Sequence, residues 1–275
     1  MRIANGCRIQ GGRIVEVGLS RNPLALFQTV EYLRAFLMAR LAWSRIGVLT
    51  IVSGAFGVFR RTTVIEAGGY ARNTVGEDME LIVRLHRHCR DRKQSYRIAY
   101  VPEPVCWTEA PQTLAVLGRQ RARWQRGALE TFATHKAMLF NPRYGRVGLL
   151  GFGSILLIDV LGPIAELIGY VIVPLFWMLG ALSPAFLLAF LAVTFAFGVA
   201  VSVGALALEE AELRRVPRVR DLVVLTFAAV AENFGYRQMN TIWRVCGVWQ
   251  WLSGAKMWGD MQRVGFRSIT SSSDS

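Results

Sequence analysis

The sequence predicts a chain in two parts, an α/β half followed by an α-helical membrane region. Strand-like and helical patterns alternate up to about residue 117, as in α/β domains. Two long apolar runs follow, at 149–179 and 183–208. The composition agrees with a membrane region, because 53% of the 275 residues are hydrophobic, only 19% are charged and the mean hydropathy is +0.33. These values are too apolar for a purely soluble protein.

The first forty residues contain short strands and then a helix. Residues 1–20 read as strands broken by glycine, with the strand-like alternation clearest in Arg8–Gln10 and Arg13–Val17. Residues 1–6 resemble the middle of a strand, so we expect the chain to lack the beginning of its domain. Pro23 then opens a helical pattern of apolar residues that continues through Arg40.

A second strand pattern leads into a turn made of small residues. Ile46–Val52 is a buried-strand candidate, and it runs into Ser53–Gly57, where the backbone could approach a ligand closely. The same turn could equally be a tight connection between strands. A short helix at Arg61–Ala67 follows, and Gly68 and Gly69 are the residues expected to end it.

Three acidic residues gather at the start of the next helix. Glu77, Asp78 and Glu80 open a helical pattern that runs to about Arg90. Carboxylates at a helix N-terminus are a common response to the helix dipole. A carboxylate acting as a general base at the mouth of a pocket is the functional alternative.

The sequence offers no recognisable metal or disulfide framework. His86 and His88 are two residues apart, so on a helix they point to nearly opposite faces and are poor candidates for a shared metal. Four cysteines are scattered without C-x-x-C spacing, which argues against a zinc site and against a set of disulfides. They are Cys7, Cys89, Cys106 and Cys246.

The segment Gly118–Gly127, GRQRARWQRG, connects the two parts of the chain. At about 100° per residue, an amide, a guanidinium, an indole and a small residue fall on one side of a helix; they are Gln120, Arg123, Trp124 and Gly127. Arginine binds phosphate oxygens and tryptophan offers a stacking face, so this side could hold an anion and a flat ring. An amphipathic helix lying on a membrane surface would show the same pattern.

The apolar runs predict two membrane spans. Upstream of both runs, Tyr96–Val101 is predicted to be a strand. The first run, 149–179, is longer than the roughly 20 residues of one span. We therefore expect a surface-lying or broken helix that leads into a true span near Ile164. Two acids in this run, Asp159 and Glu166, must face protein or water, because a charge facing lipid is costly.

Basic residues predict the orientation of these spans. Arginines are frequent at 119–146 and 214–220, whereas the link between the spans has none, so both ends of the hairpin are expected in the cytoplasm. The net charge of +13 fits a lipid bilayer and phosphate-bearing substrates. We expect no nucleic-acid partner, since aromatic and basic residues do not interleave over a soluble platform.

Several motifs in order resemble one enzyme family. Ser53-Gly54-Ala55 is followed by Gly76-Glu77-Asp78 and then by the Q-x-x-R-W pattern at Gln120-Arg121-Ala122-Arg123-Trp124, just before the membrane spans. This set resembles the C-terminal part of the catalytic domain of membrane-embedded family-2 inverting glycosyltransferases, which include cellulose, chitin, hyaluronan and poly-N-acetylglucosamine synthases. The family usually has Thr where this chain has Gly76.

The resemblance implies roles for individual residues. In the family the aspartate of the Glu-Asp pair is the general base that deprotonates the acceptor hydroxyl, so the catalytic positions here would be Asp78 with its neighbour Glu77. The resemblance also implies a donor diphosphate site at Gln120 and Arg123. It implies an acceptor site whose members are Trp124, Gly54 and Ala55.

The resemblance further implies a divalent cation, Mg²⁺ or Mn²⁺, held by a D-x-D motif. No aspartate precedes Asp78, so this chain lacks that motif and is expected to be N-terminally truncated. The resemblance implies sugar transfer from a nucleotide-diphosphate donor, with a UDP-sugar as the expected donor, to a saccharide acceptor in polysaccharide synthesis at the inner or plasma membrane. The alternative is a non-catalytic membrane fragment or subunit of such a synthase.

The expected fold is therefore the C-terminal half of a nucleotide-diphospho-sugar-binding, GT-A-like α/β domain followed by a multi-pass helical membrane region. The expected divisions are a partial glycosyltransferase domain at 1–117, an amphipathic interface helix at 118–147, a transmembrane hairpin at 148–208, cytoplasmic or interfacial amphipathic helices at 209–269 and a disordered tail at 270–275.

Overall fold

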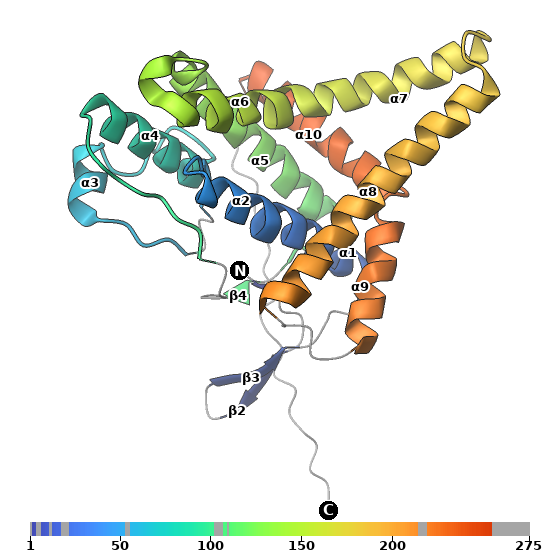
Figure 1. Cartoon of the computed structure of the whole chain (residues 1–275), viewed down its shortest axis with the longest axis horizontal. Helices are drawn as coiled ribbons and strands as arrows, with labels where there is room; N and C mark the ends of the chain where they lie inside the picture. The colour runs from blue at the N-terminus through green and yellow to red at the C-terminus, as the bar shows by residue number, and fades with distance from the viewer. Residues whose placement is uncertain are drawn as a thin grey trace, which may run out of the picture.

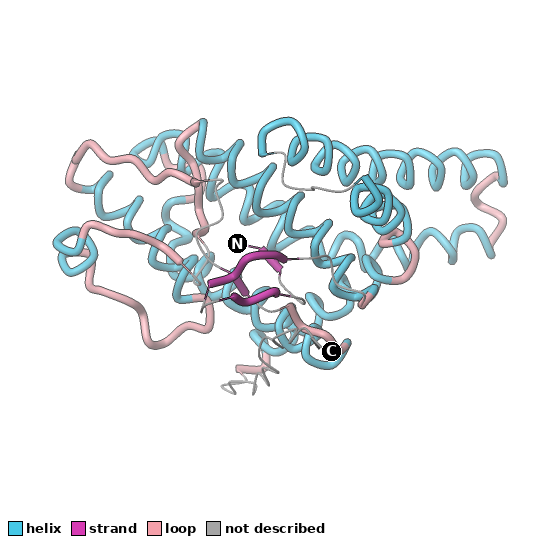
Figure 2. The backbone as a smooth tube through the Cα atoms, turned by 90° about the horizontal axis from the view of Figure 1, so that it is seen from below, coloured by secondary structure: helices cyan, strands magenta, loops and turns pink. Residues whose placement is uncertain are grey.

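The computed structural model describes residues 22–52, 56–101, 110–213 and 219–254, together with the backbone of four short strands. The strands are β1 (Arg2–Ile3), β2 (Cys7–Gln10), β3 (Arg13–Val17) and β4 (Trp107–Thr108). The antiparallel pairing of β2 with β3 confirms the two predicted strands, and β1 pairs with β4 in parallel. In the described residues these are two separate pairs (Figure 2), so a nucleotide-binding α/β sheet stays a prediction.

The first predicted helix is present and longer than expected. It consists of α1 (Pro23–Tyr32), a π-helical segment η1 (Leu33–Ala39) and α2 (Arg40–Arg45). Asn22 caps its N-terminus, because the Asn22 side chain accepts a hydrogen bond from the Leu24 amide at 2.9 Å. Pro23 at the first helical position suits this start, since its missing N–H would have no partner there.

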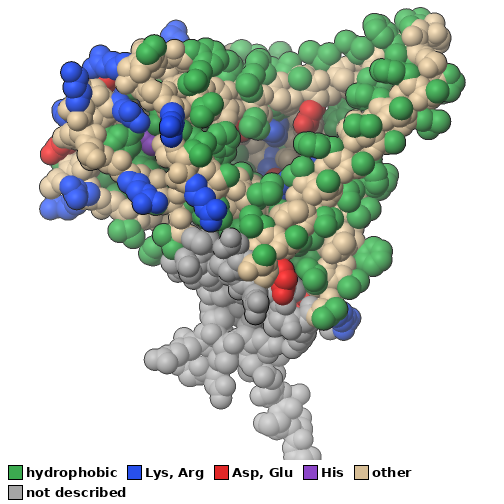
Figure 3. All heavy atoms as spheres, in the orientation of Figure 1, with side chains coloured by type: hydrophobic (Ala, Val, Ile, Leu, Met, Phe, Trp, Pro, Cys, Tyr) green, Lys and Arg blue, Asp and Glu red, His purple; other side chains and the backbone are tan. Residues whose placement is uncertain are grey.

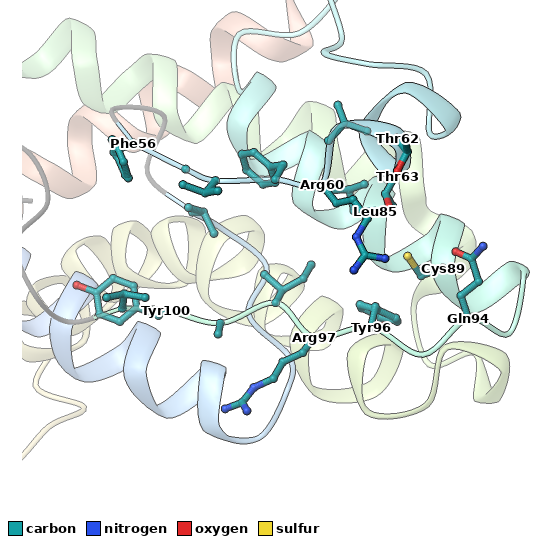
Figure 4. A pocket seen from close by; sticks show the side chains of 18 of the residues that line it. Phe56, Arg60, Thr62, Thr63, Leu85, Cys89, Gln94, Tyr96, Arg97 and Tyr100 are labelled. Carbon is teal, nitrogen blue, oxygen red and sulfur yellow. The ribbon is translucent and has the colours of Figure 1, made fainter.

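Two segments that the sequence predicts as strands have no strand partner in the described structure. Residues 48–52 and 95–101 run without regular secondary structure, and the sequence-based prediction of strands at Ile46–Val52 and Tyr96–Val101 is therefore wrong for this structure. Their apolar pattern favours a strand, but a strand also needs a neighbour for its backbone hydrogen bonds. The segment 95–101 instead lines one side of a cavity whose other side is formed by Phe56 and Arg60 (Figure 4), and of residues 48–52 only Val52 reaches this cavity.

The other helices of the first half begin and end close to the predicted residues. Helix α3 (Arg61–Glu66) ends before Gly68 and Gly69, whose φ angles of +97° and +71° are typical of helix termination. Helix α4 (Glu77–Asp91) carries the acidic cluster in its first turn. Its buried face packs against α5 (Leu114–His135), the long helix that contains the Q-x-x-R-W motif.

Helix α5 lies at the centre of the described part of the chain (Figure 1). Helix α10 (Tyr236–Leu252) packs along it, although the two helices are more than a hundred residues apart in sequence. Contact is close because glycines replace larger side chains: a Cβ atom on Gly247 would lie 2.8 Å from Cβ of Gln125. The main apolar core lies beside α5 and joins α4 to the beginning of the first apolar run; it includes Val48, Met79, Val83, Ala128, Met138, Phe152 and Ile155.

The first apolar run is one long, irregular helix. After the short 3₁₀ turns η2 (Lys136–Met138) and η3 (Pro142–Tyr144), it comprises η4 (Val147–Gly151), α6 (Phe152–Ser154), η5 (Ile155–Leu161) and α7 (Gly162–Met178), of which η4 and η5 are π-helical. Its first part packs on the core through Val147, Phe152 and Ile155, although Leu149 and Leu150 are exposed, and exposed side chains predominate from Leu157 onward. The interfacial segment and the span near Ile164 stay predictions.

Two helices are long and apolar enough to cross a membrane, Val147–Met178 and Pro184–Ala211. The second belongs to α8 (Pro184–Leu213), and it meets α7 in a hairpin that projects from the rest of the molecule (Figure 1). Hydrophobic side chains cover this projection, while lysines and arginines gather on the opposite side (Figure 3). Only 11% of each candidate window is buried within the protein, so these apolar surfaces require a non-aqueous environment or a partner.

Both acids in the first apolar run have a polar partner on α10, although Glu166 itself is exposed. Asp159 forms an ion pair with Arg244 of α10 at 3.5 Å, and Glu166 accepts a hydrogen bond from Thr241 of the same helix. Helix α10 therefore supplies the polar partners that make these carboxylates tolerable in an apolar segment. A shorter helix, α9 (Val219–Ala231), packs on α1 and α8 and completes a second apolar cluster.

Candidate functional site

The candidate site is built around the start of α4, where Glu77 and Asp78 occupy the first turn. Oδ1 of Asp78 accepts a hydrogen bond from the Met79 amide at 2.8 Å, so this carboxylate sits in the favourable field of a helix N-terminus. Both Glu77 and Asp78 are half-buried. The third member of the cluster, Glu80, faces the opposite way and is buried.

Glu80 has a structural role. Its carboxylate contacts His135 Nε2 at 3.0 Å at the end of α5 and Arg84 Nη2 at 2.9 Å. Arg84 also donates to the Ala67 carbonyl at 3.0 Å, next to the turn that ends α3. The acidic cluster therefore divides into Glu80, which joins three helices, and the pair Glu77 and Asp78, which remains at the surface of the site.

A close contact between two glycines brings the Glu-Asp pair next to the Q-x-x-R-W helix. Gly76 lies against Gly127 so tightly that a Cβ atom on Gly127 would sit 2.7 Å from Cα of Gly76. Glu130 reinforces this contact, because its Oε2 accepts hydrogen bonds from Thr74 Oγ1 at 2.7 Å and from the Val75 amide at 2.9 Å. The unusual Gly76, where the family resemblance leads one to expect Thr, thus has a packing explanation here.

Trp124 lies three residues before Gly127 and is 39% exposed. Its ring is held from one side by Tyr32 and Phe36, with ring centroids 6.2 and 6.4 Å away. The guanidinium carbon of Arg121 lies 4.5 Å from the centroid of the Trp124 ring. An indole held in this way, with part of its surface open, is suited to stacking on a ligand.

Arg40 is a site residue that the motif analysis missed. Its side chain is 5% exposed and its guanidinium lies 3.9 Å from the centroid of the Phe36 ring, which in turn neighbours Trp124. Burial lowers the pKa of Arg40 to about 10, and the electrostatic interactions with Tyr100 and with the Asp78 carboxylate oppose this lowering. Helical spacing in the sequence could have indicated that Arg40 is buried, because position 40 continues the apolar stripe of Leu33 and Leu37 and so falls on the buried face of the helix.

Of the remaining predicted site residues, the structure describes Gln120 and Arg123 but not Gly54 and Ala55. Gln120 and Arg123 lie on α5 within one turn of Trp124 and are half-buried, and Oε1 of Gln120 is a buried atom without a hydrogen-bond partner in the described structure. Gly54 and Ala55 lie outside the described residues. The geometry therefore brings together Asp78, Trp124 and the Gln-Arg pair on two touching helices, and it leaves the small-residue turn untested.

A cavity of about 920 Å³ adjoins these residues through Phe36 and Arg40. Figure 4 shows how Phe56 and Arg60 line one side of it, while Tyr96, Arg97 and Tyr100 line the other. Its volume lies in the range of small-molecule sites in proteins. The cavity mixes aromatic, aliphatic and basic side chains, so it can accommodate a ring system that carries a negative charge.

His86 at the edge of this region is a buried structural group. Its Nδ1 contacts the Tyr96 hydroxyl at 2.7 Å and its Nε2 contacts the Leu49 carbonyl at 2.8 Å. Burial lowers the pKa of His86 to about 4, the bond to Leu49 partly opposes this, and Arg90 adds to it. The imidazole is therefore neutral at physiological pH, with Nε2–H donating to Leu49 and Nδ1 accepting from Tyr96.

The described residues do not gather a metal site. Among them no three side chains of His, Cys, Asp or Glu lie close enough to hold a metal ion together. The divalent cation implied by the family resemblance therefore has no fitting donor set in the part of the chain that the structure describes, and no chemical step below is derived through it.

Comparison with known proteins agrees with these motifs. Residues 7–201 match the model of the family described as "Glycosyl transferase family group 2". The poly-beta-1,6-N-acetyl-D-glucosamine synthase of Staphylococcus aureus (strain COL) is 31% identical over 126 residues, which are 44% of this chain and 29% of that protein. The enzyme of the same name from Staphylococcus epidermidis is 29% identical over 107 residues, 39% of this chain and 24% of that protein. The matches thus span less than a third of these relatives, and no solved structure matches significantly.

Proposed function

The chain belongs to glycosyl transferase family group 2, and from this premise we propose that it transfers a sugar from a nucleotide-diphosphate donor to a saccharide acceptor at a membrane surface. The observation that carries the proposal is the Gly76–Gly127 contact, which sets Asp78 and Trp124 on neighbouring helix surfaces. A carboxylate beside an aromatic platform provides what a sugar acceptor needs, a proton acceptor and a stacking surface.

In the proposed reaction an acceptor hydroxyl oxygen attacks the anomeric carbon of the donor sugar. The bond between that carbon and the phosphate oxygen breaks, the nucleoside diphosphate leaves with its electron pair, and the hydroxyl proton passes to Asp78. Attack from the side opposite the leaving group inverts the anomeric configuration. Asp78 is suited to this role because it is a half-buried carboxylate in the first turn of α4, next to the helix that carries the Q-x-x-R-W motif.

The other motif residues divide between the two substrates. We assign Gln120 and Arg123 to the donor diphosphate, because an amide and a guanidinium are strong donors toward phosphate oxygens. Trp124 is assigned to the acceptor sugar, with Gly54 and Ala55 near the acceptor end.

The names of the relatives suggest the sugar. Both Staphylococcus proteins are named poly-beta-1,6-N-acetyl-D-glucosamine synthases, so we propose UDP-N-acetylglucosamine as the donor and a β-1,6-linked N-acetylglucosamine oligosaccharide as the acceptor. The exposed apolar surface of α7 and α8 supports a multi-pass protein in the inner or plasma membrane. The arginines that flank the two helices support a cytoplasmic position for the catalytic part.

The alternative proposal is a non-catalytic membrane fragment or subunit of such a synthase. It is favoured by one observation, the lack of any aspartate before Asp78, which leaves the chain without a D-x-D motif. The two proposals differ in whether the purified chain transfers sugar by itself, and one assay therefore distinguishes them.

The test is transfer of radiolabelled N-acetylglucosamine from its UDP donor to a β-1,6-linked oligosaccharide by the chain in detergent or vesicles with Mg²⁺. We expect Asp78→Asn to abolish transfer while UDP binding, measured by calorimetry, is retained, because the change removes only the proton acceptor. Asp91→Asn, at the other end of α4, is the matched control and should keep transfer. Undiminished turnover by Asp78→Asn would refute the assigned base, and UDP binding without any transfer by the unaltered chain would favour the non-catalytic alternative.

A further inference from the structure

We propose that Arg121, Glu31 and Tyr236 form a positioning unit that holds the Trp124 ring, and that the C-terminal helix α10 is thereby part of the acceptor site. Arg121 occupies a variable position of the Q-x-x-R-W pattern, and Tyr236 lies more than a hundred residues away. The inference deepens the acceptor role proposed for Trp124 and rests on it for its consequence in catalysis.

The unit is a buried, directly bonded set of side chains. Arg121 Nη2 donates to Glu31 Oε2 at 2.7 Å, and the Tyr236 hydroxyl donates to the same oxygen at 2.6 Å. Arg121 is 3% exposed and Tyr236 is 3% exposed. One carboxylate oxygen on α1 therefore joins the first residue of α10 to the second residue of the motif on α5.

The same guanidinium forms the support of the indole. It lies 4.5 Å from the Trp124 ring centroid and 5.6 Å from the Tyr32 ring centroid. A cation over an indole face is attracted by the ring, more strongly when it is desolvated. Because the position of Arg121 depends on Glu31 and Tyr236, the orientation of Trp124 depends on them as well.

The charges of this unit are consistent with a permanent arrangement. Burial opposes the charge of Arg121, but Glu31 and then Tyr32 and Tyr236 outweigh it, so the pKa of Arg121 lies above its ordinary value. Burial and the Glu31 carboxylate raise the pKa of Tyr236, so its hydroxyl keeps its proton and remains a donor. Arg121 thus keeps its charge and Tyr236 keeps its proton near neutral pH, so both stay hydrogen-bond donors to Glu31.

A physical test that needs no activity follows the indole directly. The full chain is labelled with 5-fluorotryptophan, and the ¹⁹F resonance of Trp124 is assigned by its disappearance in Trp124→Phe. We expect this resonance to shift or broaden in Tyr236→Phe, which removes only one hydroxyl, and in Arg121→Lys, which keeps the charge but loses the planar group. Tyr144→Phe is the matched control, because the buried Tyr144 also donates its hydroxyl to a carboxylate, Asp91 Oδ1 at 3.2 Å, far from the motif.

Unchanged Trp124 resonances in Tyr236→Phe and Arg121→Lys would overturn the proposal, as would an equal change in Tyr144→Phe. If Arg121→Lys does not fold, Tyr236→Phe decides alone. The kinetic counterpart is a KM for the oligosaccharide acceptor that rises about fivefold in Tyr236→Phe, the fold-change of one typical hydrogen bond, with an unchanged KM for the UDP donor.

The two readouts separate this inference from the proposed function. If the Trp124 resonance moves and the acceptor KM does not, the positioning unit is confirmed and the acceptor role of Trp124 is refuted. If both move together while Tyr144→Phe leaves both unchanged, both ideas are supported.

Discussion

The Gly76–Gly127 contact leads to a prediction about a single methyl group. Replacing Gly127 by Ala adds a Cβ atom 2.7 Å from Cα and 3.0 Å from the backbone nitrogen of Gly76. These obstructing atoms belong to the backbone, so no side-chain rotation can relieve the overlap. Either α5 or the first turn of α4 must move, and the first turn carries Asp78.

The expected cost follows from two opposing effects. Overpacking by a methyl group costs about 1–3 kcal/mol. Alanine in place of glycine in a helix contributes about 1 kcal/mol of stability in return. Because the clash is with backbone, we expect a net loss in the free energy of unfolding of about 1–2 kcal/mol for Gly127→Ala. For a chain of this size each kcal/mol lowers Tm by roughly 2–4 °C, so Tm should fall by about 2–8 °C.

The assay is thermal unfolding in detergent followed by circular dichroism, with sugar transfer measured on the same samples. Gly169→Ala is the matched control, since Gly169 is also helical and a Cβ atom there would meet nothing within 4 Å. Its Tm should stay the same or rise. A Tm for Gly127→Ala equal to or above that of the unaltered chain would show that the helices are not in close contact, and the argument that places Asp78 beside the Q-x-x-R-W helix would fail.

Three further changes test separate parts of the structure. Trp124→Ala should raise the acceptor KM about tenfold with little effect on the donor KM, and an effect confined to the donor would contradict stacking on the acceptor. The pKa of His86 in the folded chain is about 4, below the ordinary 6.5, so between these pH values the unfolded chain binds more protons than the folded chain. The free energy of unfolding should therefore fall by about 3 kcal/mol as the pH drops from 7 to 4. Unfolding of His86→Gln, measured across the same range, should lose this pH dependence. Arg34→Met removes the shorter of two arginine contacts to the fully buried Glu232 carboxylate, since Arg237 remains 3.6 Å away, and should cost about 3 kcal/mol, the lower end for breaking a buried pair. Arg87→Met breaks a partly exposed ion pair and should cost under about 1 kcal/mol; equal losses would refute the buried network.

The helices and their ends could be predicted from the sequence because their signals are local. Proline at the start of α1, two glycines after α3 and the acidic first turn of α4 each act within a few residues. The first apolar run is longer than one membrane thickness, which predicts that part of it packs on the rest of the protein; its first part does contact the core, and exposed side chains predominate from Leu157 onward.

The strands at 46–52 and 96–101 could not be predicted reliably from the same signals. Their apolar and β-branched residues indicate only that each segment would fit a half-buried position in a pleated sheet. Whether it becomes a strand depends on a neighbour that local sequence does not contain. In the described structure residues 96–101 border a cavity instead, which Phe36 and Arg40 also line, and of the segment 46–52 only Val52 reaches it.

The side-chain contacts that connect distant helices could not be predicted from the sequence either. Glu31 is an ordinary acid on an amphipathic helix, and Tyr236 follows a glycine after a short apolar segment. Nothing in either pattern indicates that Glu31 accepts hydrogen bonds both from a variable position of the motif and from Tyr236, because such partners are chosen by packing between residues 90 and 205 positions apart in the sequence.

Helix α5 explains why the candidate site depends on the whole chain. Three side chains along this helix form hydrogen bonds to three different parts of the chain. Arg121 donates to Glu31 of α1, and Gln125 accepts from Arg244 of α10 at 2.8 Å. Glu130 accepts from the Val75 amide in the loop before Asp78. Arg244 also pairs with Asp159 at the beginning of the candidate membrane hairpin. A displacement of that hairpin along its axis would therefore act on Gln125, one residue after Trp124, and the same bonds that stabilise the fold would transmit it to the surface on which we place the acceptor sugar.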